Sequence, residues 1–201
     1  MRVPVRSTLI CALLVLVACE SPVQPSSAAN RAVRPGAAAA LSSRHDDRDE
    51  EVRYAARGKG HYLLAGTWDV KFEFEAESQE GGRADGEFRQ STRFANGTMD
   101  ISGRVTCLAV DPINGRAWIG GVVEENRSTS PDYIDPITAP GQDVWFRVLD
   151  APDAQGAVDR STFLGFVGAF PSSAAYCVQR PWPAGNARTH PVTKGKIEVR
   201  P

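Results

Sequence analysis

The segment WDVKFEFEAES, from Trp68 to Ser78, alternates apolar and charged side chains along its length. Its apolar positions are mostly aromatic or β-branched, and acidic or basic residues separate them. Because successive side chains of a β-strand point to opposite faces, this period of two predicts a strand. One face is dry and the other meets water, which is typical of antiparallel sheets. The segment therefore restricts this part of the chain to antiparallel β structure.

Further segments carry the same signals. In RADGEFRQSTRF, Arg89 and Arg93 are expected to face the acidic row of WDVKFEFEAES across the ladder. Two Asn-Gly pairs, Asn96-Gly97 and Asn114-Gly115, separate apolar-patterned runs and indicate hairpins, because Asn-Gly tolerates positive φ angles. No long helix is predicted. The predicted strands are a four-strand meander over residues 67–78, 83–94, 97–110 and 116–125, and further strands at 142–150, 161–169, 174–179 and 195–200.

This strand pattern determines the expected fold class. About eight strands joined by short turns predict an all-β antiparallel meander that closes into a barrel, with a two-sheet β-sandwich as the alternative. Gly103, Gly120 and Gly121 lie inside strand patterns and predict bends or bulges there. Residues 59–201 are long enough for one core and are expected to form a single β domain.

The first residues are typical of an export signal. MRVPVRS contains two arginines and no acid, and TLICALLVLVA after it is almost entirely apolar. Residues 1–18 are therefore predicted to be a secretory signal peptide, since a helix needs about 20 apolar residues to span a bilayer. The segment ends at Leu16-Val17-Ala18-Cys19, which resembles the lipobox of bacterial lipoproteins. An ordinary signal peptide cleaved near Ala28-Ala29 is the alternative.

The lipobox resemblance implies a location. In bacterial lipoproteins the chain is cut before the cysteine and its sulfur carries a diacylglycerol, so Cys19 is the expected lipid acceptor. Several acyl chains on one residue hold stably to a membrane. The protein is thus expected to be an exported, membrane-anchored lipoprotein of the bacterial cell envelope, and Glu20 favours the outer membrane. Residues 19–58 are expected to form a flexible linker that becomes charged toward its end.

The other cysteines are interpreted in the light of this location. Cys11 lies inside the signal peptide and is discarded with it. Cys107 and Cys177 remain as an even pair, and in an oxidising compartment such a pair most simply forms a disulfide. We expect the bridge to join the fourth strand to a late strand. A metal or redox pair is the alternative, although there is no C-x-x-C and no histidine near either cysteine in sequence.

The body of the chain also carries a distinctive pattern. GRVTCLAVDPINGRAWIGGVV followed by VWFRVLD resembles a group of secreted bacterial proteins with G-x-V-x-C-L-x-V…G-N-x-A-W-I-G-G, then F-R-V-x-D and a second cysteine near the C-terminus. The resemblance covers residues 60–201. DPING stands where that group has a shorter Gly-Asn turn, which implies a longer or bulged hairpin. The resemblance implies a coherent β domain and no particular activity.

Charge and motifs narrow the function classes. Without residues 1–18 the chain has 21 basic and 24 acidic residues, a formal charge of −3, and no basic stripe that would indicate nucleic-acid binding. No nucleotide-binding, zinc-protease or serine-hydrolase motif occurs. We therefore assign no catalytic residue and no cofactor, and an enzyme is the less favoured reading.

Two sets of polar residues could be mistaken for sites. His61 and His190 are interpreted as surface or turn residues, as is His45 in the linker. The loop DAPDAQGAVD contains carboxylates of the kind that calcium prefers, but aspartate is also common in turns. We interpret these as loop residues, with a calcium site as the alternative; they are Asp150, Asp153 and Asp159.

Aromatic side chains are spread over several predicted strands. A barrel of about eight strands can hold one small ligand, so a cavity lined by them is one interpretation and a solid core is the favoured one. The candidates are Trp68, Phe72, Phe74, Phe88, Trp118, Trp145 and Phe146. The sequence favours a lipid-anchored β domain with a binding or structural role. The alternatives are a lipocalin-like carrier or small barrel enzyme, with His61 or Asp69 as a polar group in its cavity, and a partner-binding module with an exposed apolar patch.

Overall fold

The computed structural model describes residues 54–79, 84–152, 156–166 and 168–201, all within the second of the chain's two units, Asp46–Pro201. The predicted signal peptide, Cys19, His45 and Asp153 lie outside the described residues. The described elements are β1 (Tyr54–Leu64), β2 (Trp68–Ser78), β3 (Ala84–Phe94), β4 (Gly97–Asp111), β5 (Arg116–Asn126), η1 (Pro131–Tyr133), η2 (Pro136–Thr138), β6 (Asp143–Leu149), β7 (Arg160–Ser161), β8 (Gly165–Phe166), α1 (Ser173–Gln179), η4 (Ala184–Asn186) and β9 (His190–Arg200).

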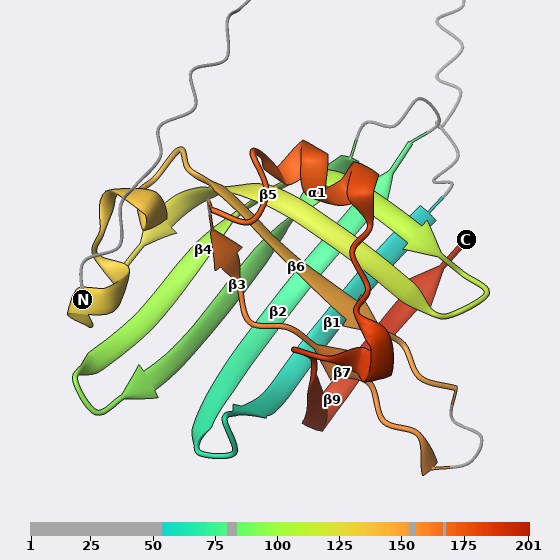
Figure 1. Cartoon of the computed structure of the whole chain (residues 1–201), viewed down its shortest axis with the longest axis horizontal. Helices are drawn as coiled ribbons and strands as arrows, with labels where there is room; N and C mark the ends of the chain where they lie inside the picture. Colours follow the sequence, from blue (N-terminus) through green and yellow to red (C-terminus); the bar gives the residue numbers. More distant parts are fainter. Residues whose placement is uncertain (1–53, 80–83, 153–155, 167) are drawn as a thin grey trace, which may run out of the picture. The chain divides into compact units, whose positions relative to one another are not determined.

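Eight of these strands close into an antiparallel barrel (Figure 1). Strands β1 to β6 pair in sequence order, β6 pairs with β7, β7 with β9, and β9 returns to β1. The short strand β8 is an additional strand on β6. The predicted all-β barrel is confirmed, and the single closed sheet excludes the two-sheet sandwich. The bulges predicted near Gly103 are also found, because the register of β4 against β5 shifts beside it.

Inward-facing side chains fill the barrel. One cluster of buried hydrophobic residues runs through the interior and draws on every long strand. Phe74 and Phe88 both contact Phe146 of β6, with ring centroids 5.3 and 6.0 Å apart. Burying a large apolar side chain stabilises a fold by about 1.5–3 kcal/mol, so this cluster is the main source of stability.

Strand β1 begins at Tyr54, so residues 54–58, which we expected in the linker, belong to the barrel. Its inward positions include Gly58 and Gly60 in place of large apolar residues. A Cβ at Gly58 would lie 2.7 Å from the ring of Phe74 on the neighbouring strand. The strand therefore leaves space for the rings of β2, and this is why it carries no alternating apolar signal.

The two Asn-Gly hairpins differ from each other. Phe94 pairs with Gly97, so Ala95 and Asn96 form the turn, and neither has a positive φ angle. The predicted hairpin is confirmed, and β4 begins at Gly97 as expected, but Asn96 does not take the positive φ angle that an Asn-Gly pair permits. The second hairpin has a four-residue loop between Asp111 and Arg116, as the DPING sequence implied.

Later parts of the chain are less regular than predicted. The expected strand at 161–169 is interrupted, because only β7 and β8 pair and the residues between them bond to the core instead. There the buried Gln90 side chain donates to the Thr162 carbonyl and accepts from the Leu164 amide. The strand predicted at 195–200 exists but begins earlier, at His190.

Helix α1 occupies the segment predicted as a strand at 174–179. It lies over the outer face of β4, β5 and β6 (Figure 1). Ser172 caps its N-terminus by accepting a hydrogen bond from the Ala175 amide at 3.1 Å, which fixes a helical turn here. The predicted Cys107–Cys177 disulfide is confirmed. It joins β4 to α1, however, and the expectation that it joins two strands is wrong.

Candidate functional site

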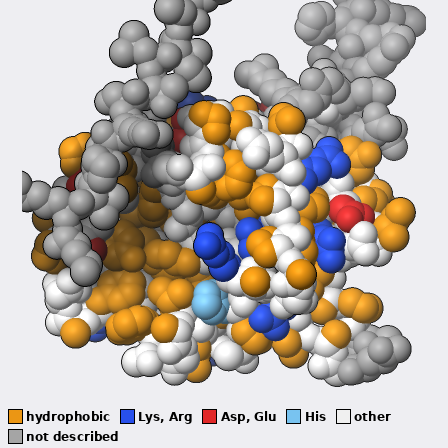
Figure 2. Space-filling view, viewed as in Figure 1, with side chains coloured by type: hydrophobic (Ala, Val, Ile, Leu, Met, Phe, Trp, Pro, Cys, Tyr) orange, Lys and Arg blue, Asp and Glu red, His pale blue; other side chains and the backbone are white. Residues whose placement is uncertain are grey.

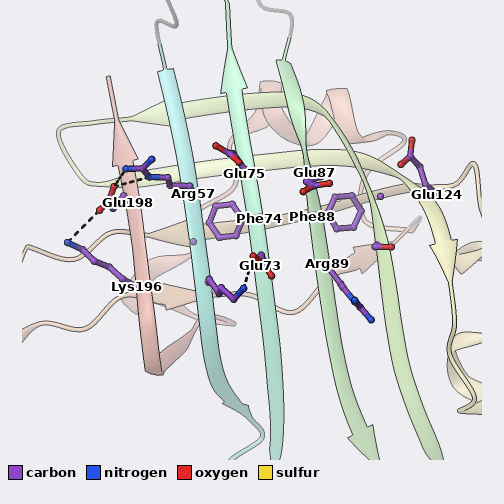
Figure 3. Close-up of a pocket in the computed structure, with 14 residues that line it drawn as sticks. Arg57, Glu73, Phe74, Glu75, Glu87, Phe88, Arg89, Glu124, Lys196 and Glu198 are labelled. Carbon is purple, nitrogen blue, oxygen red and sulfur yellow. Dashed lines mark hydrogen bonds and ion pairs between the residues drawn. The ribbon is translucent and has the colours of Figure 1, made fainter.

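A groove of about 590 Å³ lies on the outer face of the barrel, over β9, β1, β2, β3, β4 and β5 (Figure 3). We call it the outer groove. Most of its side chains are charged, which distinguishes it from the apolar interior. Its lining residues are Arg57, Gly58, Lys59, Glu73, Phe74, Glu75, Glu87, Phe88, Arg89, Ser102, Gly103, Glu124, Lys196 and Glu198.

The strand period places these charges on one surface. Along β2, the exposed side chains of Glu73 and Glu75 alternate with buried apolar side chains. Along β1, the outward positions at the same level are Arg57 and Lys59. Antiparallel register then brings outward residues of neighbouring strands opposite one another, so the charges form rows across the groove.

One such row crosses five strands and consists of Glu198, Arg57, Glu75, Glu87 and Arg104. Charges alternate along this row except at its centre, where Glu75 lies directly opposite Glu87. Arg57 already donates to Glu198 at 3.0 and 2.8 Å, and Arg104 lies 3.5 Å from Glu124. Among the described residues no ion pair reaches either central carboxylate, as Figure 3 shows.

Like charges also oppose each other on both sides of this row. Glu77 lies opposite Asp85, nearer the end of β2. In the other direction, Lys59 lies opposite Lys196, although Lys59 also donates to Glu73 at 2.8 Å. Like charges in direct cross-strand register destabilise a sheet. The outer face is therefore polarised along the strands, with carboxylates toward one end and lysines toward the other.

The ion pairs at the groove edge shift the pKa of their members. The hydrogen bond from Arg57 holds the pKa of Glu198 below its ordinary value. The same bond raises the pKa of Arg57, and the nearby charges of Glu75 and Glu77 add to the effect. These side chains are well exposed, so the pair contributes little to stability. Their fixed charges nevertheless shape the electrostatic potential in the groove.

The aromatic residues considered for a cavity fall into three places. Phe72, Phe74 and Phe88 are buried in the barrel core. Trp118 and Trp145 lie outside the barrel, in a second cluster with Tyr176 of α1. The remaining candidate, Trp68, is partly exposed at the start of β2 and contacts Phe94 at 5.4 Å. Phe146 is also buried in the barrel core. The structure therefore does not bring the seven side chains together around one space.

The two described histidines, His61 and His190, have different partners. His61 Nδ1 is 3.0 Å from Asp69 Oδ2, and both side chains are exposed. His190 stacks on the buried ring of Tyr62, with centroids 5.2 Å apart. Burial, helped by Arg160, lowers the pKa of His190. Within the part of the chain that the structure describes, no group of three His, Cys, Asp or Glu side chains is arranged to hold a metal ion.

The loop aspartates bond to backbone amides of the barrel. Asp159 accepts from the Ala151 amide at 2.9 Å and from the Ile197 amide at 2.7 Å. Asp150 accepts from the Val199 amide at 2.9 Å. The two carboxylates thus accept from amides of β9 that lie beyond its short pairing with β7. They take the place of the carbonyl groups that a longer neighbouring strand would supply.

Asp150 provides a pH-dependent test of this arrangement. Burial raises its pKa, and the charge of Asp159 adds to the rise. The folded state then binds the Asp150 proton more tightly than the unfolded state, so this residue lowers stability as pH rises above about 4. Asp150→Asn keeps an acceptor for the Val199 amide but cannot ionise. As pH rises from 4 to 7, the free energy of unfolding of D150N should increase relative to that of the wild type. The increase should be under about 1 kcal/mol, since the site is partly screened by solvent.

Urea unfolding of both proteins at the two pH values measures this change. Asp132→Asn, at an exposed carboxylate on η1, is the control and should leave the difference between the pH values unchanged. A relative gain for D150N at pH 4 instead of pH 7 would contradict the assignment.

Comparison of the chain with family models, curated proteins and solved structures finds no match. Among the described residues, no helix has the length and apolar character needed to cross a membrane. The disulfide indicates an oxidising location outside the cytoplasm. Sequence reasoning did not identify the outer groove. Its one available signal was the acidic row of β2, which becomes informative only when the register with β3 is known.

Proposed function

We propose that this protein is a non-enzymatic binding module of the bacterial cell envelope, anchored to a membrane through lipid on Cys19, which binds a basic segment of a protein partner in the outer groove. The lipobox-like sequence supports the anchor, and the disulfide supports export to an oxidising compartment. The outer groove supplies the binding surface. The observation that carries the proposal is the like-charge pair of Glu75 and Glu87 at its centre.

The Glu75–Glu87 pair favours a cationic partner because the repulsion between the two carboxylates lowers the stability of the free protein. An opposed pair of like charges is destabilising, whereas an opposed pair of unlike charges contributes roughly 0.2–1 kcal/mol. The neighbouring arginines relieve the pair only in part, because Arg57 donates to Glu198 and Arg104 lies 3.5 Å from Glu124, although the charge of Glu75 also acts on Arg57. A cationic group that binds between the two carboxylates removes their repulsion, and this makes binding more favourable.

The location of the pair fits a macromolecular partner. The interior of the barrel is filled by its own side chains, so a partner can reach only the exterior. The outer groove is open and extends over six strands, and its charges are separated along the strand direction. Such complementarity gives specificity and increases the rate of association, and both effects weaken as salt concentration rises.

The test compares Glu75→Gln/Glu87→Gln with a control that removes the same charge elsewhere, Glu125→Gln/Asp132→Asn. Tetralysine serves as the probe, and isothermal titration calorimetry at low and at 0.3 M salt is the measurement. The groove variant should bind tetralysine about threefold or more weakly than the wild type at low salt. It should also be more stable by about 0.5 kcal/mol, because the repulsion is gone. The control should keep wild-type binding and gain no stability.

Two outcomes would contradict this function. If the control variant loses as much affinity for tetralysine as the groove variant, tetralysine binding depends only on the net charge of the protein. Lower stability of the groove variant would show that Glu75 and Glu87 support the fold and do not form a strained binding pair.

A further inference from the structure

Two arginines on the outer face of β5 and β6, outside the groove lining, share one indole ring. The guanidinium carbon of Arg116 lies 4.7 Å from the centre of the Trp182 ring, and that of Arg147 lies 5.3 Å from it. Arg116 begins β5, Arg147 lies in β6, and Trp182 follows α1. None of them lines the outer groove. In Figure 2, Lys and Arg side chains gather in the middle of the view, beside a histidine.

The strand register explains why these side chains meet. Arg147 lies opposite Trp118, and Arg116 lies opposite Leu149 two residues further along β6. Both arginines therefore occupy neighbouring outward positions of adjacent strands. The segment after α1 packs over them, since Trp118 Nε1 donates to the Pro181 carbonyl at 3.0 Å and Trp182 Nε1 donates to Asn186 Oδ1 at 2.9 Å.

The charge of Arg147 is buried and lacks a counterion. Only 7% of Arg147 is exposed, and its Nη2 donates to the backbone carbonyl of Ala187 at 2.8 Å. Among the described residues no carboxylate lies within ion-pair distance of Arg147 or Arg116. The Nε groups of both arginines are buried without an acceptor. A buried ion without a partner is costly, and the indole ring compensates only part of this cost.

One neighbouring carboxylate offsets part of this positive potential. Asp111 lies opposite Arg116 in the ladder and accepts from the Asn114 amide and side chain at 3.2 and 2.7 Å. The bond from Asn114 lowers the pKa of Asp111, and the charge of Arg116 adds to this effect, but no ion pair joins the two side chains among the described residues. A third arginine, Arg160, lies in β7 opposite Leu149 and donates to Thr189. The charge of Arg160 is felt at His190, whose pKa it helps to lower.

We infer that Arg116 and Arg147, beside Trp182, form a binding site for a phosphate-type oxyanion. The guanidinium group presents parallel N–H donors that match the oxygens of such an anion, and it forms stronger hydrogen bonds with ionised acceptors than with neutral ones. An oxyanion bound here accepts from the guanidinium group of Arg116, the less buried of the two arginines. It also offsets the buried charge of Arg147, which no carboxylate of the described residues reaches. The site shares strand β5 with the outer groove but none of its lining residues, and it is independent of the proposed function.

Inorganic phosphate is the probe for this site. The full chain with Cys19→Ser, which has no acyl chain, is titrated with phosphate by calorimetry, with chloride at equal ionic strength as the reference. Arg116→Gln is the main variant because Arg116 is only half-buried, so the variant should fold. Arg93→Gln is the matched control, since Arg93 is exposed on β3 and its replacement removes the same charge.

Phosphate should bind the parent protein, R116Q should reduce its affinity at least tenfold, and R93Q should change it less than twofold. Tryptophan fluorescence should change with phosphate in the parent, and Trp182→Phe should remove most of that change. No phosphate binding above the chloride reference would overturn the inference, and so would equal losses in R116Q and R93Q.

A second arm identifies the source of the phosphate group. The same three proteins are sedimented with vesicles of phosphatidylglycerol and with vesicles of phosphatidylcholine. Binding to phosphatidylglycerol that R116Q reduces and R93Q retains would identify a lipid headgroup as the ligand. Phosphate binding without such vesicle binding would identify a soluble phosphate compound. Vesicle binding that R116Q and R93Q reduce equally would count against the site.

Discussion

Replacing Cys107 and Cys177 together with alanine is expected to lower the free energy of unfolding by about 4 kcal/mol. The bridge closes a loop with a sequence separation of 70 residues, and it ties α1 to β4. Without it, the unfolded chain regains the freedom that the loop had removed. Urea unfolding of the wild type and of the double variant, followed by far-UV circular dichroism, measures the difference.

Reduction of the wild type provides the control for this prediction. Because Tyr176 of α1 stacks on Trp145 of β6, loss of the bridge should change the near-UV signal of these rings more than the far-UV signal of the barrel. The reduced wild type should then unfold at the same urea concentration as the double variant. Equal midpoints for the oxidised wild type and the variant would mean that the bridge adds no stability.

Replacing Cys19 with serine is expected to release the protein from the membrane fraction or to leave its precursor uncleaved. The reason is chemical, since only a thiol accepts the diacylglycerol in the proposed modification and stable anchoring needs the acyl chains. Cell fractionation followed by immunoblotting, with the mass of the exported product, measures both results.

Cys11 provides the matched control for that experiment. It lies only eight positions earlier in the sequence and is expected to be discarded with residues 1–18. Cys11→Ser should therefore give a membrane-bound, fully processed protein. A membrane-bound C19S protein of normal mature mass would contradict the lipid anchor, and with it the proposed place of the protein in the envelope.

The contrast between β1 and β2 shows what local sequence can predict. The alternation in β2 follows from large inward rings and charged outward residues, so the strand was found with nearly correct bounds. Strand β1 lies beside those rings and carries Gly58 and Gly60 at inward positions. The rings of β2 leave no room for larger side chains at these two positions. For this reason β1 lacks the apolar alternation from which a strand is predicted.

The helix α1 was missed for a different reason. Its sequence, SAAYCVQ, is short and contains residues that suit either state, so the strand prediction was reasonable on propensity alone. The cap at Ser172 and the packing of Tyr176 and Cys177 on the outside of the barrel decide the outcome. These contacts join segments distant in sequence, and local propensity is a weak guide in such cases.

The outer groove depends on register in the same way. Arg89 was expected to face the acidic row of β2, and it does lie opposite Glu73, but it bonds to Asp100 of β4 at 2.9 and 2.7 Å. Arg93 was expected in the same role and lies opposite Thr98 of β4. The like-charge pair of Glu75 and Glu87 arises because the β2–β3 register places them together. A shift of the strands by two residues would have opposed different charges, and the sequence alone does not specify that choice.

The barrel closes where β1 meets β9, through contacts such as that of Arg57 with Glu198, 141 residues apart in the chain. A chain emerging from the ribosome or from an export channel can form the β2–β5 meander early, but it remains an open sheet with unpaired edges until β9 arrives. Contacts of such long sequence separation slow folding and prolong exposure of those edges. The barrel can therefore close only after nearly the whole chain has emerged. Until then, the unpaired edges of the open sheet are exposed to aggregation.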